Sequence, residues 1–289
     1  MSLSIFTSAS SMASTNALNK SNSMLSTAME RLGTGKRINS AADDAAGLQI
    51  ATRLLGQSNG MAVAQRNISD STALMQTAEG AFDEVSNIMY RMKDLATQAA
   101  NDTNTTKDRD AINAELNDLN SELKNIMDNT SYAGEKLFGA SGKFSKELNF
   151  QIGSSSGETM KIDLASELNG TSGLFTSSGF GFGDWSSASG VNISDAAGAK
   201  TLMQDLESKL NDVGAVRSKM GASINRLGHT ASNLANMKDN TELALSNIQD
   251  ADFASEASSM TRNQMLAQTS MSMLKQSNSM SSMVMSLLG

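Results

Sequence analysis

The sequence predicts a mainly α fold: a long antiparallel helical bundle or coiled coil, with a β-hairpin and a small Gly/Ser-rich β/loop outer excursion. Apolar residues recur in steps of three and four over long stretches of the 289-residue chain, which is the spacing of one helix face. Proline, the strongest helix breaker, is absent. Aromatic residues make up only 4%, so the apolar content lies in Leu, Ile, Ala and 20 Met, which suits helix seams.

Both terminal segments are predicted to be helices that are buried against other helices. Lys20 is the only ionisable side chain from residue 1 to 29, and Lys275 is the only one from 263 to 289. Apolar residues recur every seven positions in both segments: Leu18, Leu25, Leu32, and Leu266, Met273, Met280, Leu287. Termini are normally charged and solvated, so this pattern predicts assembly with other copies. Because ordering each end costs conformational entropy that its own apolar side chains barely offset, we expect both ends to be disordered in the free subunit.

The next elements have the same periodicity. Residues 32–35 (LGTG) interrupt the first helix, and Ser40, with Asp43 three residues later, is predicted to cap the second. A long helix is predicted from about 61 to 99, since twelve positions step by three and four with only Ser71 polar. The turn NDTNTT separates it from a second helix that begins near Thr106. So short a turn predicts an antiparallel helical hairpin.

The middle of the chain changes in character. Half of the 22 glycines lie between residues 139 and 198. Alternating apolar residues at 148–152 and 160–164, separated by residues 153–158, predict a β-hairpin. Residues 170–190 are too rich in Gly and Ser for a helix, so they form either a small exposed β/loop unit or a flexible excursion. Helical periodicity returns at about residue 200 and continues into the apolar terminal segment.

Composition excludes several classes of function. The net charge of −7 and the lack of a Lys/Arg cluster argue against a nucleic-acid partner. Cysteine is absent and His229 is the single histidine, so a thiolate site or a two-histidine zinc site is impossible; His229 is expected on a helix surface. We expect no catalytic residue, metal or cofactor. The first residues lack the pattern of a cleavable signal peptide, and no apolar run is long enough to insert into a membrane.

Five segments resemble motifs of the bacterial flagellin family. They are 30–48 (ERLGTGKRINSAADDAAGL), 76–81 (QTAEGA), 215–222 (AVRSKMGA), 248–254 (IQDADFA) and 284–288 (VMSLL). The resemblance covers roughly residues 1–140 and 200–289. One departure is Tyr132-Ala133-Gly134, where members often have Phe-Asn-Gly, so the turn before Lys136 is expected to differ.

The resemblance implies a structural subunit that polymerises into the bacterial flagellar filament for motility. The implied parts are terminal helices 1–40 and 245–289 as the inner filament core, a helical bundle of 41–140 and 200–244, and a hairpin with a short variable outer region, 141–199. The implied partners are further copies of the chain, the flagellar export apparatus and its chaperone, the filament cap and the hook-junction proteins. The implied location is the extracellular flagellum, reached without a cleaved signal peptide.

The resemblance also implies two sets of contact residues. The residues expected to contact other subunits in the inner core are Leu18, Leu25, Leu32, Phe253, Met260, Leu266, Met273, Leu274, Met280 and Leu287. The second set matches a segment that in flagellins meets an animal Toll-like receptor and neighbouring subunits: Arg91, Leu95, Gln98 and Glu115. A solvated or subunit-contact face is the alternative for this second set. The serines of 171–190 are candidates for O-linked sugars by the same analogy.

Three other functions compete with a filament subunit. A hook–filament junction protein of the flagellum shares terminal helices of this kind, but the long matches at 30–48 and 248–254 favour flagellin. A secreted enzyme on the same scaffold would need a His, Cys or paired-acid set that the middle of the chain lacks. A generic coiled-coil adaptor would not need two nearly uncharged ends.

Overall fold

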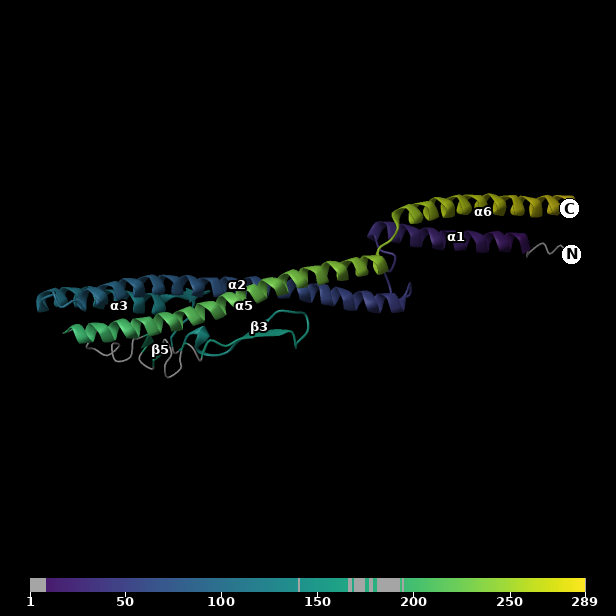
Figure 1. The fold of residues 1–289 in the computed structure, drawn as a ribbon. Coiled ribbons are helices and arrows are strands. Elements are labelled where there is room, and N and C mark those ends of the chain that lie inside the picture. The colour runs from purple at the N-terminus through teal and green to yellow at the C-terminus, as the bar shows by residue number, and fades with distance from the viewer. Residues whose placement is uncertain are drawn as a thin grey trace. The chain divides into compact units, whose positions relative to one another are not determined.

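Long helices dominate the structure, a computed structural model that describes residues 9–139, 141–165, 168, 175–176, 179–180, 193 and 195–288, with backbone alone at 175–176, 179–180, 281–282 and 284–288. The helices are α1 (Ala9–Thr34), α2 (Ala45–Ala99), α3 (Thr106–Asn129), α5 (Ala196–Gln249) and α6 (Phe253–Leu288) (Figure 1). The predicted mainly α fold is therefore confirmed. The residues group into two compact units, one of residues 1–58 with 239–289 and one of residues 59–238. The three-part division predicted from the sequence stays a prediction.

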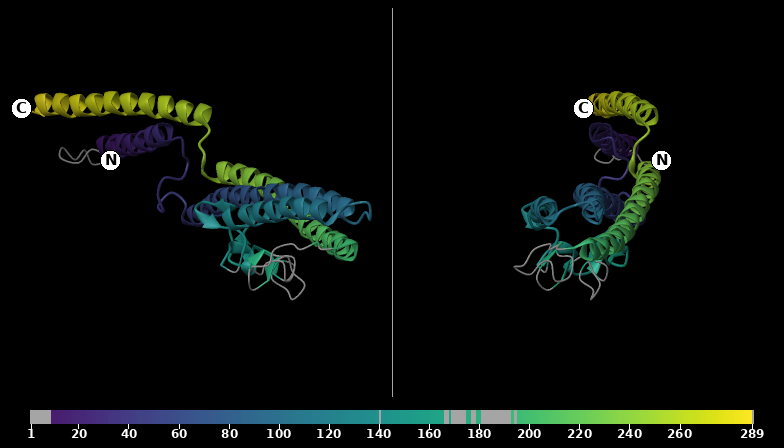
Figure 2. Two further views of the ribbon diagram at one scale, coloured as in Figure 1. Left: turned by 90° about the vertical axis from the view of Figure 1, so that its left-hand side faces the viewer. Right: turned by 60° about the vertical axis from the view of Figure 1, so that its left-hand side comes forward.

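The second unit, residues 59–238, has its own hydrophobic core between α2, α3 and α5, which run side by side in Figures 1 and 2. Every apolar position predicted along residues 61–99 is buried, and Met75, Phe82 and Met89 are completely so. Ser71, the one polar member of that series, is also buried, and its hydroxyl donates to the carbonyl of Asn67 at 2.6 Å. The backbone acceptor satisfies the buried hydroxyl, so the series is not interrupted.

Side-chain hydrogen bonds cap both helix ends at the α2–α3 connection. Thr105 is the N-cap of α3 and forms a capping box with Asp108. Hydrogen bonds from the Thr105 hydroxyl and backbone N–H lower the pKa of Asp108 below its usual value. Arg109 reaches back and donates to the carbonyls of Ala99, at 3.1 Å, and Asn101, at 3.2 Å. The start of α3 near Thr106 and its antiparallel turn are thus as predicted.

Short strands come after α3. They pair as antiparallel hairpins: β1 (Ser131–Tyr132) with β2 (Glu135–Lys136), β3 (Leu148–Gln151) with β4 (Thr159–Ile162), and β5 (Phe175–Thr176) with β6 (Gly179–Phe180), and a 3-10 turn, η1 (Lys143–Ser145), precedes β3. The predicted hairpin at 148–164 is confirmed, with Phe150 opposite Met160. Met160 and Ile162 face the core of the second unit. The rest of the predicted Gly/Ser-rich excursion lies outside the described residues.

Phenylalanine rings join this β region to the helices. Phe138, just after β2, meets Phe82 of α2 edge to face, with ring centroids 4.9 Å apart. On its other side Phe138 stacks on Phe144 at 5.9 Å. Both arrangements are favourable for aromatic pairs. The chain has few aromatic residues, and three of them fix the β1–β2 hairpin and η1 against α2.

The β1–β2 turn contains the one described non-glycine residue with a positive φ, Ala133 at 51°, followed by Gly134 at 82°. Two positive φ values in a two-residue turn are typical of type I′, which favours Asn-Gly. We expect Ala133→Asn to raise the free energy of unfolding by roughly 1 kcal/mol, since Asn tolerates this conformation better than Ala. Thermal unfolding measured by circular dichroism tests this, with Gly134→Ala as the matched control that should destabilise. A lower melting temperature for Ala133→Asn would contradict it.

Candidate subunit-contact surface

In the first unit, residues 1–58 with 239–289, α1 and α6 lie side by side and antiparallel (Figures 1 and 2). The hydroxyls of Ser10 and Ser277 are 3.0 Å apart at one end of the pair. At the other end, Arg31 Nη1 donates to Glu256 Oε1 at 2.9 Å, and both side chains are largely shielded from solvent. These contacts fix the register of the two helices. A partly shielded, charge-assisted bond of this kind is stronger than an exposed ion pair.

The seam between α1 and α6 is built mainly from small residues. The side chains that α1 buries fully in it are Ser21 and Ala28. Those that α6 buries fully are Asn263, Ala267 and Ser277. The predicted contact residues Leu18, Leu25, Leu32, Met260 and Leu274 are half-buried. Small side chains allow two helices to approach closely, but they remove little apolar area from water.

The larger predicted contact residues of α6 face away from α1. Phe253, Leu266, Met273 and Met280 are exposed, and the side chain of Leu287 lies outside the described residues. The heptad of Leu266, Met273 and Met280 is therefore not the face that meets α1. Its neighbours Ala267 and Leu274 also repeat every seven residues, and they point to α1 instead. Heptad spacing alone cannot distinguish two adjacent positions of the same repeat.

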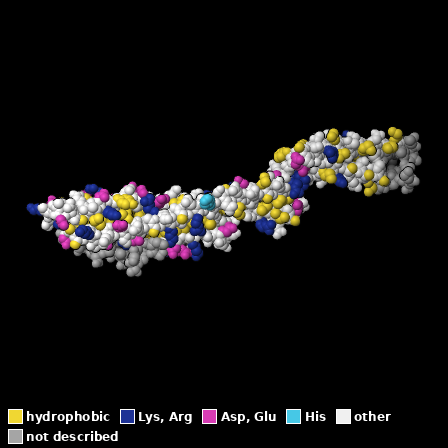
Figure 3. Space-filling model, viewed as in Figure 1, with side chains coloured by type: hydrophobic (Ala, Val, Ile, Leu, Met, Phe, Trp, Pro, Cys, Tyr) yellow, Lys and Arg dark blue, Asp and Glu magenta, His cyan; other side chains and the backbone are white. Residues whose placement is uncertain are grey.

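The exposed apolar side chains of α6 are spread over the sides that α1 does not cover, rather than along one stripe. Met265, Leu266 and Met271 are 57%, 48% and 48% exposed. Successive residues are rotated by about 100°, so these three side chains are spread around the helix axis. Figure 3 shows hydrophobic side chains across the visible face of the part that contains α1 and α6. Exposed Leu and Met side chains gathered on one helix are typical of a surface that a partner covers, and α1 covers only one side of α6.

A short backbone pairing joins the connection between α1 and α2 to the connection between α5 and α6. The N–H of Arg37 donates to the carbonyl of Gln249 at 2.7 Å, and the N–H of Ala251 donates to the carbonyl of Gly35 at 3.0 Å. Arg37 Nη2 also donates to the carbonyl of Ile248 at 2.8 Å. This junction brings together the segments 30–48 and 248–254, which lie about 200 residues apart in the sequence. No local sequence pattern signals this proximity, and the Arg31–Glu256 ion pair is evident only from the structure.

The turn before α2 corrects one prediction. Ser40 does not cap α2; its hydroxyl and backbone N–H donate to the carboxylate of Asp43, at 3.0 and 2.8 Å. These bonds, with one from the backbone of Asn39, lower the pKa of Asp43. Asp44 caps α2, because its carboxylate accepts from the N–H of Gly47 at 2.8 Å. Asp43 and Asp44 are adjacent in the sequence, and it is Asp44 that caps α2.

The predicted receptor-contact set is only partly a surface. Arg91 of α2 and Glu115 of α3 form an exposed ion pair at 2.6 Å, and Gln98 is exposed. Leu95 is 3% exposed and belongs to the core of the second unit. Although Leu95 lies one turn from Arg91, it points inward between the helices. The set is therefore an exposed polar trio beside a buried leucine, and its role as a contact site stays a prediction.

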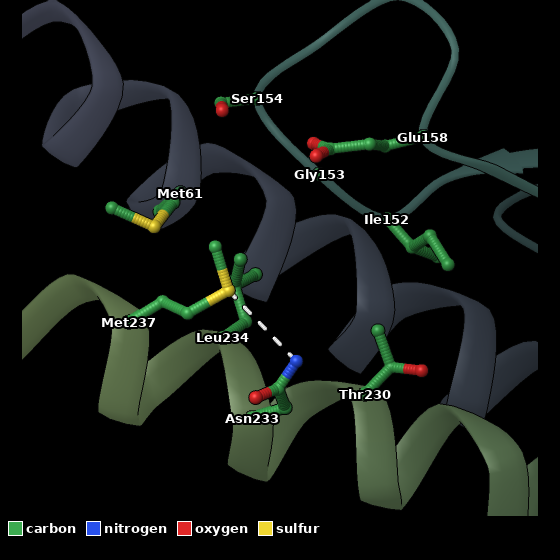
Figure 4. A pocket seen from close by; sticks show the side chains of 9 residues that line it. All are labelled: Met61, Ile152, Gly153, Ser154, Glu158, Thr230, Asn233, Leu234 and Met237. Carbon is green, nitrogen blue, oxygen red and sulfur yellow. Dashed lines mark hydrogen bonds between the residues drawn. The ribbon is translucent and has the colours of Figure 1, made fainter.

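The described residues hold little that resembles a catalytic or ligand site. The pocket drawn in Figure 4 lies between α2, the β3–β4 turn and α5, and its side chains include Met61, Leu234 and Met237. Glu158 points toward the turn and accepts from the N–H of Ser155 at 3.0 Å, so it closes the hairpin. Among the residues that the structure describes, no group of three His, Cys, Asp or Glu could hold a metal, and no helix is both long and apolar enough to cross a membrane. His229 is exposed on α5, as predicted.

Comparisons with known proteins match most of the chain. Residues 5–143 match the bacterial flagellin N-terminal helical region and residues 203–288 match the C-terminal helical region. Flagellin A of Vibrio cholerae serotype O1 is 33% identical, and flagellin A of Vibrio anguillarum is 32% identical, each over the full length of both chains. A solved structure of a putative flagellar hook-associated protein from Vibrio parahaemolyticus aligns with a TM-score of 0.58 over 72% of this chain and all of that one, at 15% identity. This last similarity shows the fold alone.

Two glycines at the end of α1 provide a test of the junction. Gly35 has a φ of 73° and its N–H donates to the carbonyl of Arg31 at 2.8 Å, which ends the helix in the left-handed conformation. We expect Gly35→Ala to destabilise the first unit by about 1 kcal/mol. Gly33 lies within the helix with nothing within 4 Å of an added Cβ, so Gly33→Ala should be neutral or stabilising. Thermal melting of assembled subunits, measured by circular dichroism, compares the two, and equal effects would contradict the assignment.

Proposed function

Because the chain belongs to the bacterial flagellin family, we propose that its paired helices α1 and α6 are the part that other copies bury in the core of the flagellar filament. The protein is a structural subunit that self-polymerises into this filament, on which bacterial motility depends. The comparisons give the function of the chain as a whole. The exposure of α6 and the distribution of charge support the assignment of its inner surface.

The observation that supports the proposal most strongly is the exposed apolar surface around α6. Full burial of a Leu, Phe or Met side chain stabilises a protein by roughly 1.5–3 kcal/mol. Phe253, Leu266, Met273 and Met280 contribute little of this in one chain, because they are exposed. Further copies packed around the helix would supply the missing contacts. The predicted inner-core residues thus divide into half-buried seam residues and exposed residues that need a partner.

The distribution of charge supports the same assignment. Burying an ion without a partner costs several kcal/mol, so a surface that enters a helical core should carry few charges. From residue 263 to the end of the chain Lys275 is the only ionisable side chain, and α1 has only Lys20 before Glu30. Exposed apolar residues with few charges characterise interfaces that bury large areas. Polar Ser and Asn residues fill the remaining positions and keep the free helix soluble.

We infer no chemical activity for the subunit. Flagellin is a structural protein family, and the role proposed here is to transmit, through helical packing, mechanical work delivered at the base of the filament. The absence of cysteine and proline suits passage of an extended chain through a narrow export channel. We accordingly propose the export apparatus and its chaperone, the filament cap and the hook-junction proteins as further partners, and secretion without a cleaved signal peptide.

The alternative function, a hook–filament junction protein, is less well supported. The similarity to a putative hook-associated protein is at 15% identity, which reports the fold. The full-length relatives at 32–33% identity are flagellins. Contact of Arg91, Gln98 and Glu115 with an animal Toll-like receptor stays a prediction. So does O-linked modification of the serines of 171–190, which lie outside the described residues.

Two substitutions of one α6 residue test the proposed contact surface. Met273 is 60% exposed, so neither Leu nor Asp there should alter the fold of the free subunit. We expect Met273→Asp to slow seeded elongation by about a hundredfold or more, because a buried carboxylate costs several kcal/mol and each 1.4 kcal/mol is tenfold. Met273→Leu should elongate within about twofold of wild type, since it keeps the apolar volume. Elongation is measured by light scattering and electron microscopy.

Circular dichroism of the free subunits controls for loss of fold in both variants. Normal elongation by correctly folded Met273→Asp subunits would exclude this face of α6 from the subunit contact. Equal impairment of Met273→Leu would indicate that the site responds to any change, and not to lost apolar burial.

A further inference from the structure

Methionine is the only sulfur-containing residue of this chain, which has 20 Met and no Cys. Thiolates react with peroxides readily where they are present, and here none competes. Oxidation of the chain by a peroxide therefore falls on methionine thioethers. Oxidation changes Met from a flexible apolar side chain into a polar sulfoxide. The position of each Met in the structure then decides what such a change does.

Two classes of described methionines differ sharply in exposure. Those completely buried in the core of the second unit are Met61, Met75, Met89, Met92, Met127 and Met220. Those about half exposed or more on α1 and α6 are Met12, Met24, Met29, Met265, Met271, Met273, Met280 and Met283. Methionines of the buried class react only when the core opens, whereas those of the exposed class are accessible to any small oxidant. The reactive class coincides with the surface that is proposed to contact neighbouring subunits.

We propose that the exposed methionines of α1 and α6 are peroxide-modification sites that decide whether a free subunit can enter the filament. The inference rests on the proposed function of the α1–α6 surface. The thioether sulfur attacks one peroxide oxygen and the O–O bond breaks. An S–O bond forms, and the second peroxide oxygen leaves as water with both protons, so the sulfur is oxidised by two electrons and the peroxide is reduced by two. No further reactant is required.

Burial decides the consequence of this oxidation. A sulfoxide oxygen is a strong acceptor, and an acceptor buried without a donor loses its hydrogen bonds to water. In the proposed contact the thioethers of Met265 and Met273, which are 57% and 60% exposed in the free chain, would be covered by a neighbouring subunit, so each new oxygen would lose contact with water. An oxidised subunit should therefore add to a filament end poorly. A subunit that has already been incorporated has the same methionines covered, so its vulnerability is confined to the free state.

The first test is a map of oxidation rates. Purified free subunits and purified filaments are treated with hydrogen peroxide, and peptide mass spectrometry measures the gain of one oxygen at each Met. In free subunits we expect Met265, Met273 and Met280 to react about tenfold or more faster than Met75, Met89 and Met92. Equal rates in the two classes would overturn the proposal. In filaments the exposed class should slow to the rate of the buried class.

The second test is seeded elongation by subunits oxidised only at the exposed class. We expect the elongation rate to fall about tenfold or more, and methionine sulfoxide reductase to restore it. A variant in which every methionine of the exposed class is replaced by Leu should keep elongating after the same treatment. If that variant fails to polymerise, the proposal is still tested by whether methionine sulfoxide reductase restores elongation of the oxidised wild type. Oxidised subunits that elongate at the untreated rate would overturn the proposal.

The two tests together separate this inference from the assignment of the surface. If filament assembly leaves the reactivity of Met265 and Met273 unchanged, the proposed contact surface is wrong, and this inference with it. If assembly protects these residues but oxidised subunits still elongate normally, the contact surface stands and the inference alone is overturned.

Discussion

The seam between α1 and α6 is the constraint on which the arrangement of this protein depends. Its fully buried members are Ser, Asn and Ala, so the two helices lie close together and bury little apolar area. The large apolar side chains of α6 are left on its other sides. Within one chain, the narrow α1–α6 seam cannot cover the exposed apolar side chains of α6. Polymerisation resolves the conflict, since each new subunit covers surface that its neighbours leave open.

The second unit shows the opposite design from the same residue types. There α2, α3 and α5 bury their methionines and leucines against one another, and the Phe82–Phe138–Phe144 contacts fix the β region to the helices. Thr105 caps the start of α3, and the Arg109 side chain donates to a backbone carbonyl at the end of α2. This unit needs no neighbour for its core. The chain therefore combines one unit that buries its own apolar residues with another unit whose large apolar residues stay exposed.

Sequence periodicity predicted the features that local spacing determines. The buried positions of residues 61–99, the start of α3 and the β3–β4 hairpin were all predicted, because steps of three and four, capping residues and alternation each act over a few residues. The features that the sequence left undetermined depended on distant partners. The heptad of Leu266 and Met273 marked an apolar face without identifying its neighbour, and Leu95 was expected at the surface although its turn faces the core. The pairing of residues 35–37 with 249–251 joins segments too far apart for any local pattern to predict.

The central claim is that α6 gains its stability from other copies. Amide hydrogen exchange over residues 265–280, compared between the free subunit and the filament, tests this most directly. Exchange in the free subunit should be fast, because the seam with α1 supplies too little burial to hold the helix closed. In the filament the same amides should be protected as strongly as those of residues 75–92. Strong protection of residues 265–280 in the free subunit would show that α1 alone stabilises α6, and would contradict the account.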